Sequence, residues 1–142
     1  MIHFQQAWEQ KSFKIALDCL TKILGLGIGL TPTGDDFITG LLASFSALKQ
    51  LPSNFQQLAV LAKERTNAVS YAEIHEAVNE RFSQLVQRVF LSIESGNTNE
   101  MAQAVSALEE VGSTSGSDIL CGIIFGLKLF CEENNHDNSN SN

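Results

Sequence analysis

Hydroxyl, glycine and aspartate residues occur together twice in this chain, at the same spacing. Residues 31–40 read TPTGDDFITG and residues 113–122 read STSGSDILCG, and the two segments are 82 positions apart. Backbone N–H groups at a helix start and hydroxyl groups bind anionic or carbonyl oxygens, whereas carboxylates bind hard cations. The repeat therefore predicts a small-molecule site, a cation site or a purely structural device.

The structural interpretation is that each segment caps a helix. Thr33 with Asp36, and Ser115 with Asp118, match a capping box with Asp in place of Glu. Each cap would stabilise its helix by about 1 kcal/mol. Capping leaves Gly40 and Gly122 unexplained, because glycine inside a helix is unfavourable relative to alanine.

Close packing of the two helices explains those glycines. Gly40 with Ser44, and Gly122 with Gly126, place two small residues one turn apart on each helix. Such grooves let two helix backbones cross at short range. We therefore expect the two helices to pair about a pseudo-twofold axis. The pairing would bring the Gly34 and Gly116 amides to one polar site for a phosphate, carboxylate or ureido oxygen.

The acidic residues leave three interpretations of this site open. Asp35, Asp36 and Asp118 would repel a bare anion, so they either serve as caps or hold a cation such as Mg²⁺. A site for an anion or a polar small molecule, a magnesium site, and capping with packing alone all agree with the spacing. The sequence implies no other cofactor.

Two further segments could contribute to the same site. Gly25, Gly27 and Gly29 lack the spacing of a dinucleotide fingerprint, but their loop can turn backbone amides toward a ligand. Thr66, Asn67 and Ser70 precede a predicted helix, where they either line a pocket or cap the helix.

Apolar residues at three- and four-residue steps predict an all-α fold of about six helices. The expected helices cover approximately residues 4–24, 34–51, 53–62, 71–94, 101–111 and 116–130. We expect residues 1–131 to form one helical domain and residues 132–142, which are polar throughout, to form a disordered tail.

Composition restricts the class of protein. A net charge of −7 with no basic run argues against binding to nucleic acid or to an anionic membrane. The three cysteines are odd in number and no two of them are close in sequence, so a disulfide framework is not indicated. This favours a reducing compartment with buried thiols. No secretory signal opens the chain, so we expect a cytoplasmic protein.

The glycine-rich segment from Gly25 through Asp36, with Gly40 and the downstream segment from Gly112 to Gly122, resembles a bacterial family. That family is typified by a subunit of the oxamate carbamoyltransferase of allantoin degradation. Members carry an N-terminal region before the glycine-rich motif, so the resemblance assigns this chain to their C-terminal half. The resemblance implies carbamoyl transfer between a ureido acid such as oxalurate and phosphate, with other protein subunits as partners.

The sequence thus supports three hypotheses of function. The first is a carbamoyltransferase component that binds a small anionic or carbamoyl-bearing metabolite, either with other subunits or as a homo-oligomer. The second is a non-catalytic helical interaction module, and the third is a magnesium-dependent hydrolase similar in style to ADP-ribosylglycohydrolases. The candidate ligand contacts are Gly27, Gly29, Thr31, Thr33, Gly34, Asp35, Asp36, Ser113, Ser115, Gly116 and Asp118.

Overall fold

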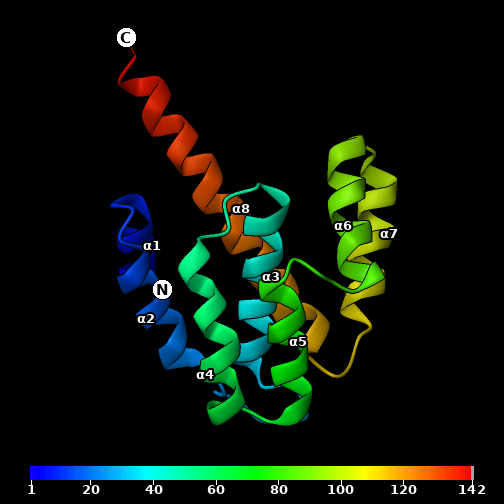
Figure 1. Cartoon of the computed structure of the whole chain (residues 1–142). Helices are drawn as coiled ribbons and strands as arrows, with labels where there is room; N and C mark the ends of the chain where they lie inside the picture. The colour runs from blue at the N-terminus through cyan, green and yellow to red at the C-terminus, as the bar shows by residue number, and fades with distance from the viewer. Residues whose placement is uncertain (142) are drawn as a thin grey trace.

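The residues that the structure describes fold into eight α-helices and one short 3₁₀ helix (Figure 1). The computed structural model describes residues 1–141, and this range contains no β-strand. The elements are α1 (Ile2–Glu9), α2 (Phe13–Ile23), α3 (Thr33–Ala47), η1 (Ser53–Gln56), α4 (Gln57–Arg65), α5 (Ala68–Val78), α6 (Gln84–Ser95), α7 (Thr98–Glu109) and α8 (Ser115–Ser139). The all-α prediction is confirmed, but the predicted number of about six helices is too low.

Helices α3 and α8 form the centre of the molecule, and the other helices lie to either side of them (Figure 1). One apolar core joins α3 to α1, α2, α4 and α5, and its largest members include Phe4, Trp8, Phe45 and Phe55. The rings of Trp8 and Phe45 stack with centroids 4.1 Å apart. A second core joins α8 to the α6–α7 hairpin. The central pair therefore connects two otherwise separate layers.

Glycines explain how closely α3 and α8 approach. A Cβ atom at Gly40 would lie 1.9 Å from the Ile119 carbonyl oxygen, and one at Gly122 would lie 2.1 Å from the Phe37 carbonyl oxygen. Phe37 and Ile119 are themselves equivalent positions of the repeat, 82 residues apart. The contacts are thus reciprocal, and the predicted pairing of the two helices is confirmed.

The additional helices arise because two predicted helices are each broken. The predicted helix over residues 4–24 divides after Glu9, where Lys11 has a φ of 55°, and the one over 71–94 divides after Val78, where Glu80 has a φ of 60°. Ser83 then begins α6, because its hydroxyl accepts a hydrogen bond from the Val86 amide. Local hydrogen bonds thus interrupt a continuous apolar pattern at positions where no glycine or proline marks the break.

The C-terminal segment is helical rather than irregular, because α8 continues from the predicted end near residue 130 to Ser139. Contacts with the start of the chain accompany the extension: Gln5 Nε2 donates to Glu132 Oε2 at 2.8 Å, and Lys11 pairs with Glu133. The mobility predicted for residues 132–142 stays a prediction, and Asn142 lies outside the described residues.

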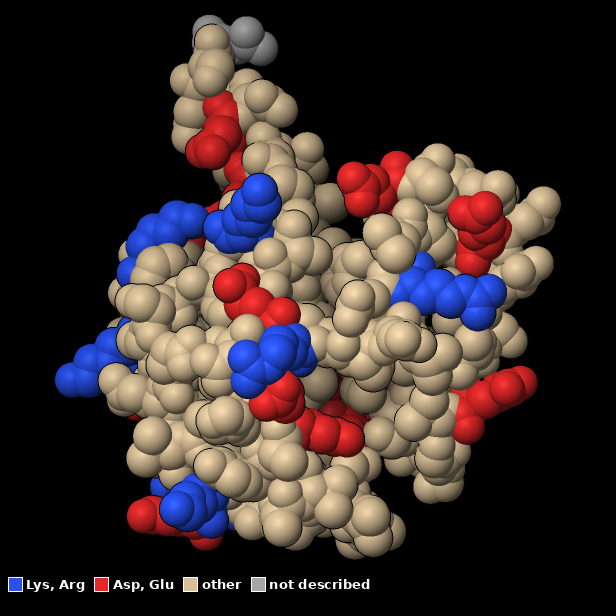
Figure 2. All heavy atoms as spheres, turned by 45° about the vertical axis from the view of Figure 1, so that its right-hand side comes forward, with Lys and Arg blue, Asp and Glu red and all other residues tan. Residues whose placement is uncertain are grey.

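The surface differs from the prediction at the cysteines, since Cys121 and Cys131 are exposed and Cys19 is half-buried. On the face drawn in Figure 2, acidic and basic side chains are scattered and form no continuous basic patch. Within residues 1–141, no helix has both the length and the apolar character that crossing a membrane requires.

Candidate functional site

The two halves of the repeat meet at the starts of α3 and α8. Thr31 Oγ1 donates a hydrogen bond to Ser115 Oγ over 3.2 Å, which joins hydroxyl groups 84 residues apart in sequence. Both side chains are half-buried. The convergence predicted from the repeat is therefore present in the structure.

The capping interpretation of the repeat is wrong. Helix α3 has Pro32 at its N-cap and α8 has Thr114, and neither helix start has a side-chain capping hydrogen bond. Thr33 and Ser115 are instead the first residues inside their helices. A capping side chain needs the non-helical backbone of the preceding position to reach the free amides. The hydroxyls and carboxylates of the repeat are consequently not used as caps.

The predicted amide donors are already engaged within the protein. The Gly34 amide donates to the Leu26 carbonyl at 2.9 Å, and the Gly116 amide donates to the Val111 carbonyl at 3.0 Å. Both glycines are needed for packing, because a Cβ atom would lie 2.0 Å from Ile23 O at Gly34 and 1.8 Å from Leu108 O at Gly116. These two amides are therefore not free for a ligand, contrary to the prediction.

Asp36 is the most unusual residue of the site. It is fully buried, and neither of its carboxyl oxygens makes a hydrogen bond of normal geometry with a described residue, although the hydroxyls of Thr31 and Ser115 lie close to it. Burial raises its pKa from 3.8 to about 6, while the neighbouring hydroxyls of Ser115 and Thr31 lower it in part and the carboxylates of Glu73 and Asp118 raise it further. A buried carboxyl without partners destabilises a fold. Asp36 is thus a strong candidate for a functional group.

Asp35, in contrast, has a structural role. Its Oδ1 accepts a hydrogen bond from the Gly25 amide at 2.7 Å, and its Oδ2 accepts one from the Thr66 hydroxyl. Asn67 Oδ1 caps α5 by accepting from Val69 N and Ser70 N. These bonds fasten the glycine-rich loop and the start of α5 to α3, so Asp35, Thr66 and Asn67 are occupied within the protein.

The remaining predicted residues divide into two groups. Asp118 Oδ2 and Ser70 Oγ are buried and lack partners within the described chain, as does Thr39 Oγ1, which the prediction did not include. Thr33, Ser113, Gly27 and Gly29 are exposed. Gly27 permits a close backbone approach, since a Cβ atom there would lie 2.6 Å from the Thr33 nitrogen.

The carboxylates do not form a recognisable metal centre. Across residues 1–141, no three or more His, Cys, Asp and Glu side chains are grouped as metal ligands. Asp35 accepts a hydrogen bond from the Gly25 amide, so its carboxylate is not free to share a cation with Asp36 and Asp118. The magnesium site at Asp35, Asp36 and Asp118 stays a prediction that this geometry does not support.

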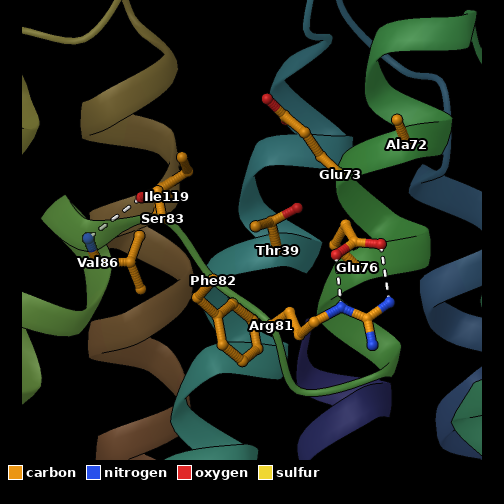
Figure 3. A pocket seen from close by; sticks show the side chains of 9 residues that line it. All are labelled: Thr39, Ala72, Glu73, Glu76, Arg81, Phe82, Ser83, Val86 and Ile119. Atoms are coloured by element: carbon orange, nitrogen blue, oxygen red, sulfur yellow. Dashed lines mark hydrogen bonds and ion pairs between the residues drawn. The ribbon is translucent and has the colours of Figure 1, made fainter.

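A pocket of ≈ 330 Å³ lies between α3, α5, the start of α6 and α8 (Figure 3). Thr39 and Glu73 project into it, and Arg81 at its edge makes a two-bond ion pair with Glu76. Its apolar walls come from Ala72, Phe82, Val86 and Ile119. Sequence reasoning missed this pocket, because it lies at the break between α5 and α6, within a predicted continuous helix.

Comparison with known proteins agrees with the resemblance seen in the motifs. The family described as oxamate carbamoyltransferase subunit AllH matches residues 23–127, which include both copies of the repeat. No solved structure matches the chain. Because this match covers more than half of the chain, the chain belongs to the family of the oxamate carbamoyltransferase subunit AllH.

Proposed function

We propose that this chain is a component of a carbamoyltransferase and binds the –CO–NH₂ group of a carbamoyl or ureido compound at Asp36. The family match supports the reaction class. The observation that carries the site is the complete burial of Asp36 with both carboxyl oxygens unpartnered. An ionised carboxylate accepts hydrogen bonds only, so it suits the N–H groups of a carbamoyl ligand.

The surroundings of Asp36 favour this ligand over a simple anion. The amides of Gly34 and Gly116 are occupied by carbonyl groups, so the expected donors for phosphate are missing. Asp118 and Glu73 add further negative charge near Asp36. These carboxylates would repel an anionic group placed against Asp36, whereas the uncharged –CO–NH₂ end of a metabolite is tolerated there, with its anionic end directed away.

Two hydroxyl groups complete the proposed site. Thr31 and Ser115 are hydrogen-bonded to each other and lie beside the Asp36 carboxyl. Their rotation would let them donate to the carbonyl oxygen of the bound carbamoyl group, on which negative charge develops during acyl transfer. In this arrangement Asp36 orients the nitrogen end and the hydroxyls stabilise the oxygen end.

A binding titration tests the proposal. Oxamate, oxalurate, carbamoyl phosphate and inorganic phosphate are each added, with and without Mg²⁺, and the melting temperature is recorded. We expect the three carbamoyl-bearing compounds to stabilise the chain, by about 2.7 kcal/mol at 100 times Kd, because they bind only the folded state. Phosphate should have no effect.

Two variants make the titration specific. Asp36→Asn should abolish the stabilisation, and Asp18→Asn, which changes an exposed carboxylate on α2, should preserve it. Unfolding cannot explain a loss of binding in Asp36→Asn if its melting temperature without ligand equals or exceeds that of the wild type. Unchanged binding by Asp36→Asn, or an equal response to phosphate alone, would overturn the proposal.

The other hypotheses have less support. A non-catalytic module explains the glycine packing but gives no reason for a buried, unpartnered Asp36. A magnesium-dependent hydrolase would need a group of metal ligands, which the described residues do not form. Cytoplasmic localisation and the identity of the partner subunits stay predictions.

A further inference from the structure

We propose that the pocket between α5 and α6 is a second ligand site, which binds a small organic cation with an apolar carbon skeleton. Its volume of ≈ 330 Å³ lies within the range of small-molecule pockets. None of its lining residues belongs to the proposed carbamoyl site at Thr31, Asp36, Ser115 and Asp118. The proposal therefore does not depend on the assignment of that site.

The polar end of the pocket lacks a partner. The Thr39 side chain is 9% exposed, and its hydroxyl oxygen is buried without a hydrogen-bond partner in residues 1–141. Figure 3 shows this hydroxyl and the Glu73 carboxylate in the space between α3 and α5. Buried hydroxyls are rarely left without a partner, so the Thr39 hydroxyl needs one from the pocket, which a ligand can supply.

The charge at this end favours a cation. Glu73 forms no ion pair within the described part of the chain, and its side chain is exposed to the pocket side. Desolvation by the surrounding protein raises its pKa, and the negative charge of Asp35 raises it further. The guanidinium of Arg81 is held by both oxygens of Glu76, so its charge is compensated.

The walls determine the rest of the ligand. Phe82, Val86 and Ile119 come from three different segments and present apolar side chains to the pocket, with Ala72 on the α5 side. An ammonium group beside Glu73 and Thr39 would leave its carbon skeleton against these residues. An aromatic or branched primary amine has this combination of a cationic head and an apolar body.

The test uses amide chemical shifts of the whole chain, with benzylamine as the cationic probe. Benzamide and benzoate have the same ring but a neutral and an anionic head. We expect benzylamine to shift amide resonances around Thr39, Glu73 and Phe82 and to bind at least tenfold more tightly than benzamide, with no binding of benzoate. Equal or stronger binding of benzamide or benzoate would contradict a cation site.

Four variants separate this site from a nonspecific surface. Glu73→Gln should weaken benzylamine binding at least tenfold, whereas Glu64→Gln, on the exposed surface of α4, should leave it unchanged. Ala72→Trp should fill the pocket and abolish binding, with the spectrum otherwise retained. Thr39→Val should weaken binding three- to fivefold yet raise the melting temperature, because it removes an unpartnered buried hydroxyl.

Each result has a defined meaning. Absence of shifts at millimolar benzylamine, or binding that Glu73→Gln and Ala72→Trp leave intact, would refute the second site. Carbamoyl binding is read separately from the Asp36→Asn titration, so either proposal can fail alone.

Discussion

The two copies of the repeat have the same packing but different chemistry. Gly40 and Gly122 contact each other's helices reciprocally, at the Ile119 and Phe37 carbonyl groups. Asp36, however, is fully buried with two unpartnered oxygens, whereas the equivalent Asp118 is half-buried with one. The repeated glycines therefore build the helix pair, while the first copy supplies most of the proposed polar site.

The neighbouring position differs even more between the copies. Asp35 is buried and accepts hydrogen bonds from Gly25 and Thr66, whereas its equivalent in the second copy, Ser117, is exposed. Only the first copy is therefore fastened to a preceding glycine-rich loop and to α5. The first copy is thus anchored through a side chain at a position where the second copy faces solvent.

The largest expected effect comes from the shared packing. Gly40→Ala and Gly122→Ala should each destabilise the fold by roughly 3 kcal/mol or more, because the added methyl group overlaps a carbonyl oxygen that belongs to a rigid helix. Urea denaturation measures the loss, with the exposed Thr33→Ala as the control. Similar stability of all three variants would show that the two helices pack less closely than described.

A second prediction concerns the burial of Asp36 and its dependence on pH. The pKa of Asp36 is raised to about 6 in the folded state, so the folded protein binds a proton that the unfolded chain releases between pH 4 and pH 6. Stability from this group therefore falls as pH rises through that range and stays constant above it. Asp36→Asn lacks the effect.

The measurement is the difference in unfolding free energy between Asp36→Asn and wild type. This difference should shift in favour of the variant by about 2 kcal/mol from pH 4 to pH 7. A difference that does not vary with pH would mean that Asp36 is not a strained buried carboxyl.

The third prediction tests the asymmetry at the adjacent position. Asp35→Ala leaves the Gly25 amide and the Thr66 hydroxyl without their acceptor, so it should cost about 2 kcal/mol. Ser117→Ala, at the equivalent exposed position, should change stability by less than about 0.5 kcal/mol. Thermal unfolding compares the two, and equal losses would remove the proposed difference between the copies.

The smallest expected effect lies at Ser44 and Gly126, which are also equivalent positions. Ser44 Oγ donates to the Ile123 carbonyl oxygen at 2.9 Å, whereas Gly126 has no side chain and packs against Ser44 Cβ. Ser44→Ala should therefore destabilise the protein by about 1 kcal/mol, the value of one hydrogen bond. The Ser46 hydroxyl donates to Glu80 at the surface, so Ser46→Ala should destabilise the protein less than Ser44→Ala does. A larger loss of stability in Ser46→Ala would contradict the role given to the buried Ser44 hydrogen bond.

Sequence reasoning succeeded where a requirement was local or repeated. Regular apolar spacing identified α3, α4, α7 and the start of α8, and the cost of Gly40 and Gly122 inside helices predicted that another backbone lies against them. It failed for the breaks that separate α1 from α2 and α5 from α6. Lys11 and Glu80 adopt positive φ values there, and neither residue type signals such a conformation.

The amino-acid sequence by itself determined the all-α class, the pairing of the two repeated helices and the family motif, because these depend on periodicity and on glycines with no alternative use. Only the tertiary structure decided which polar groups remain free. Gly34, Gly116 and Asp35 look as suitable as Asp36 in sequence, yet hydrogen bonds with the loops that follow α2, α4 and α7 occupy them. The availability of a polar group depends on distant neighbours, and spacing along one chain segment does not reveal them.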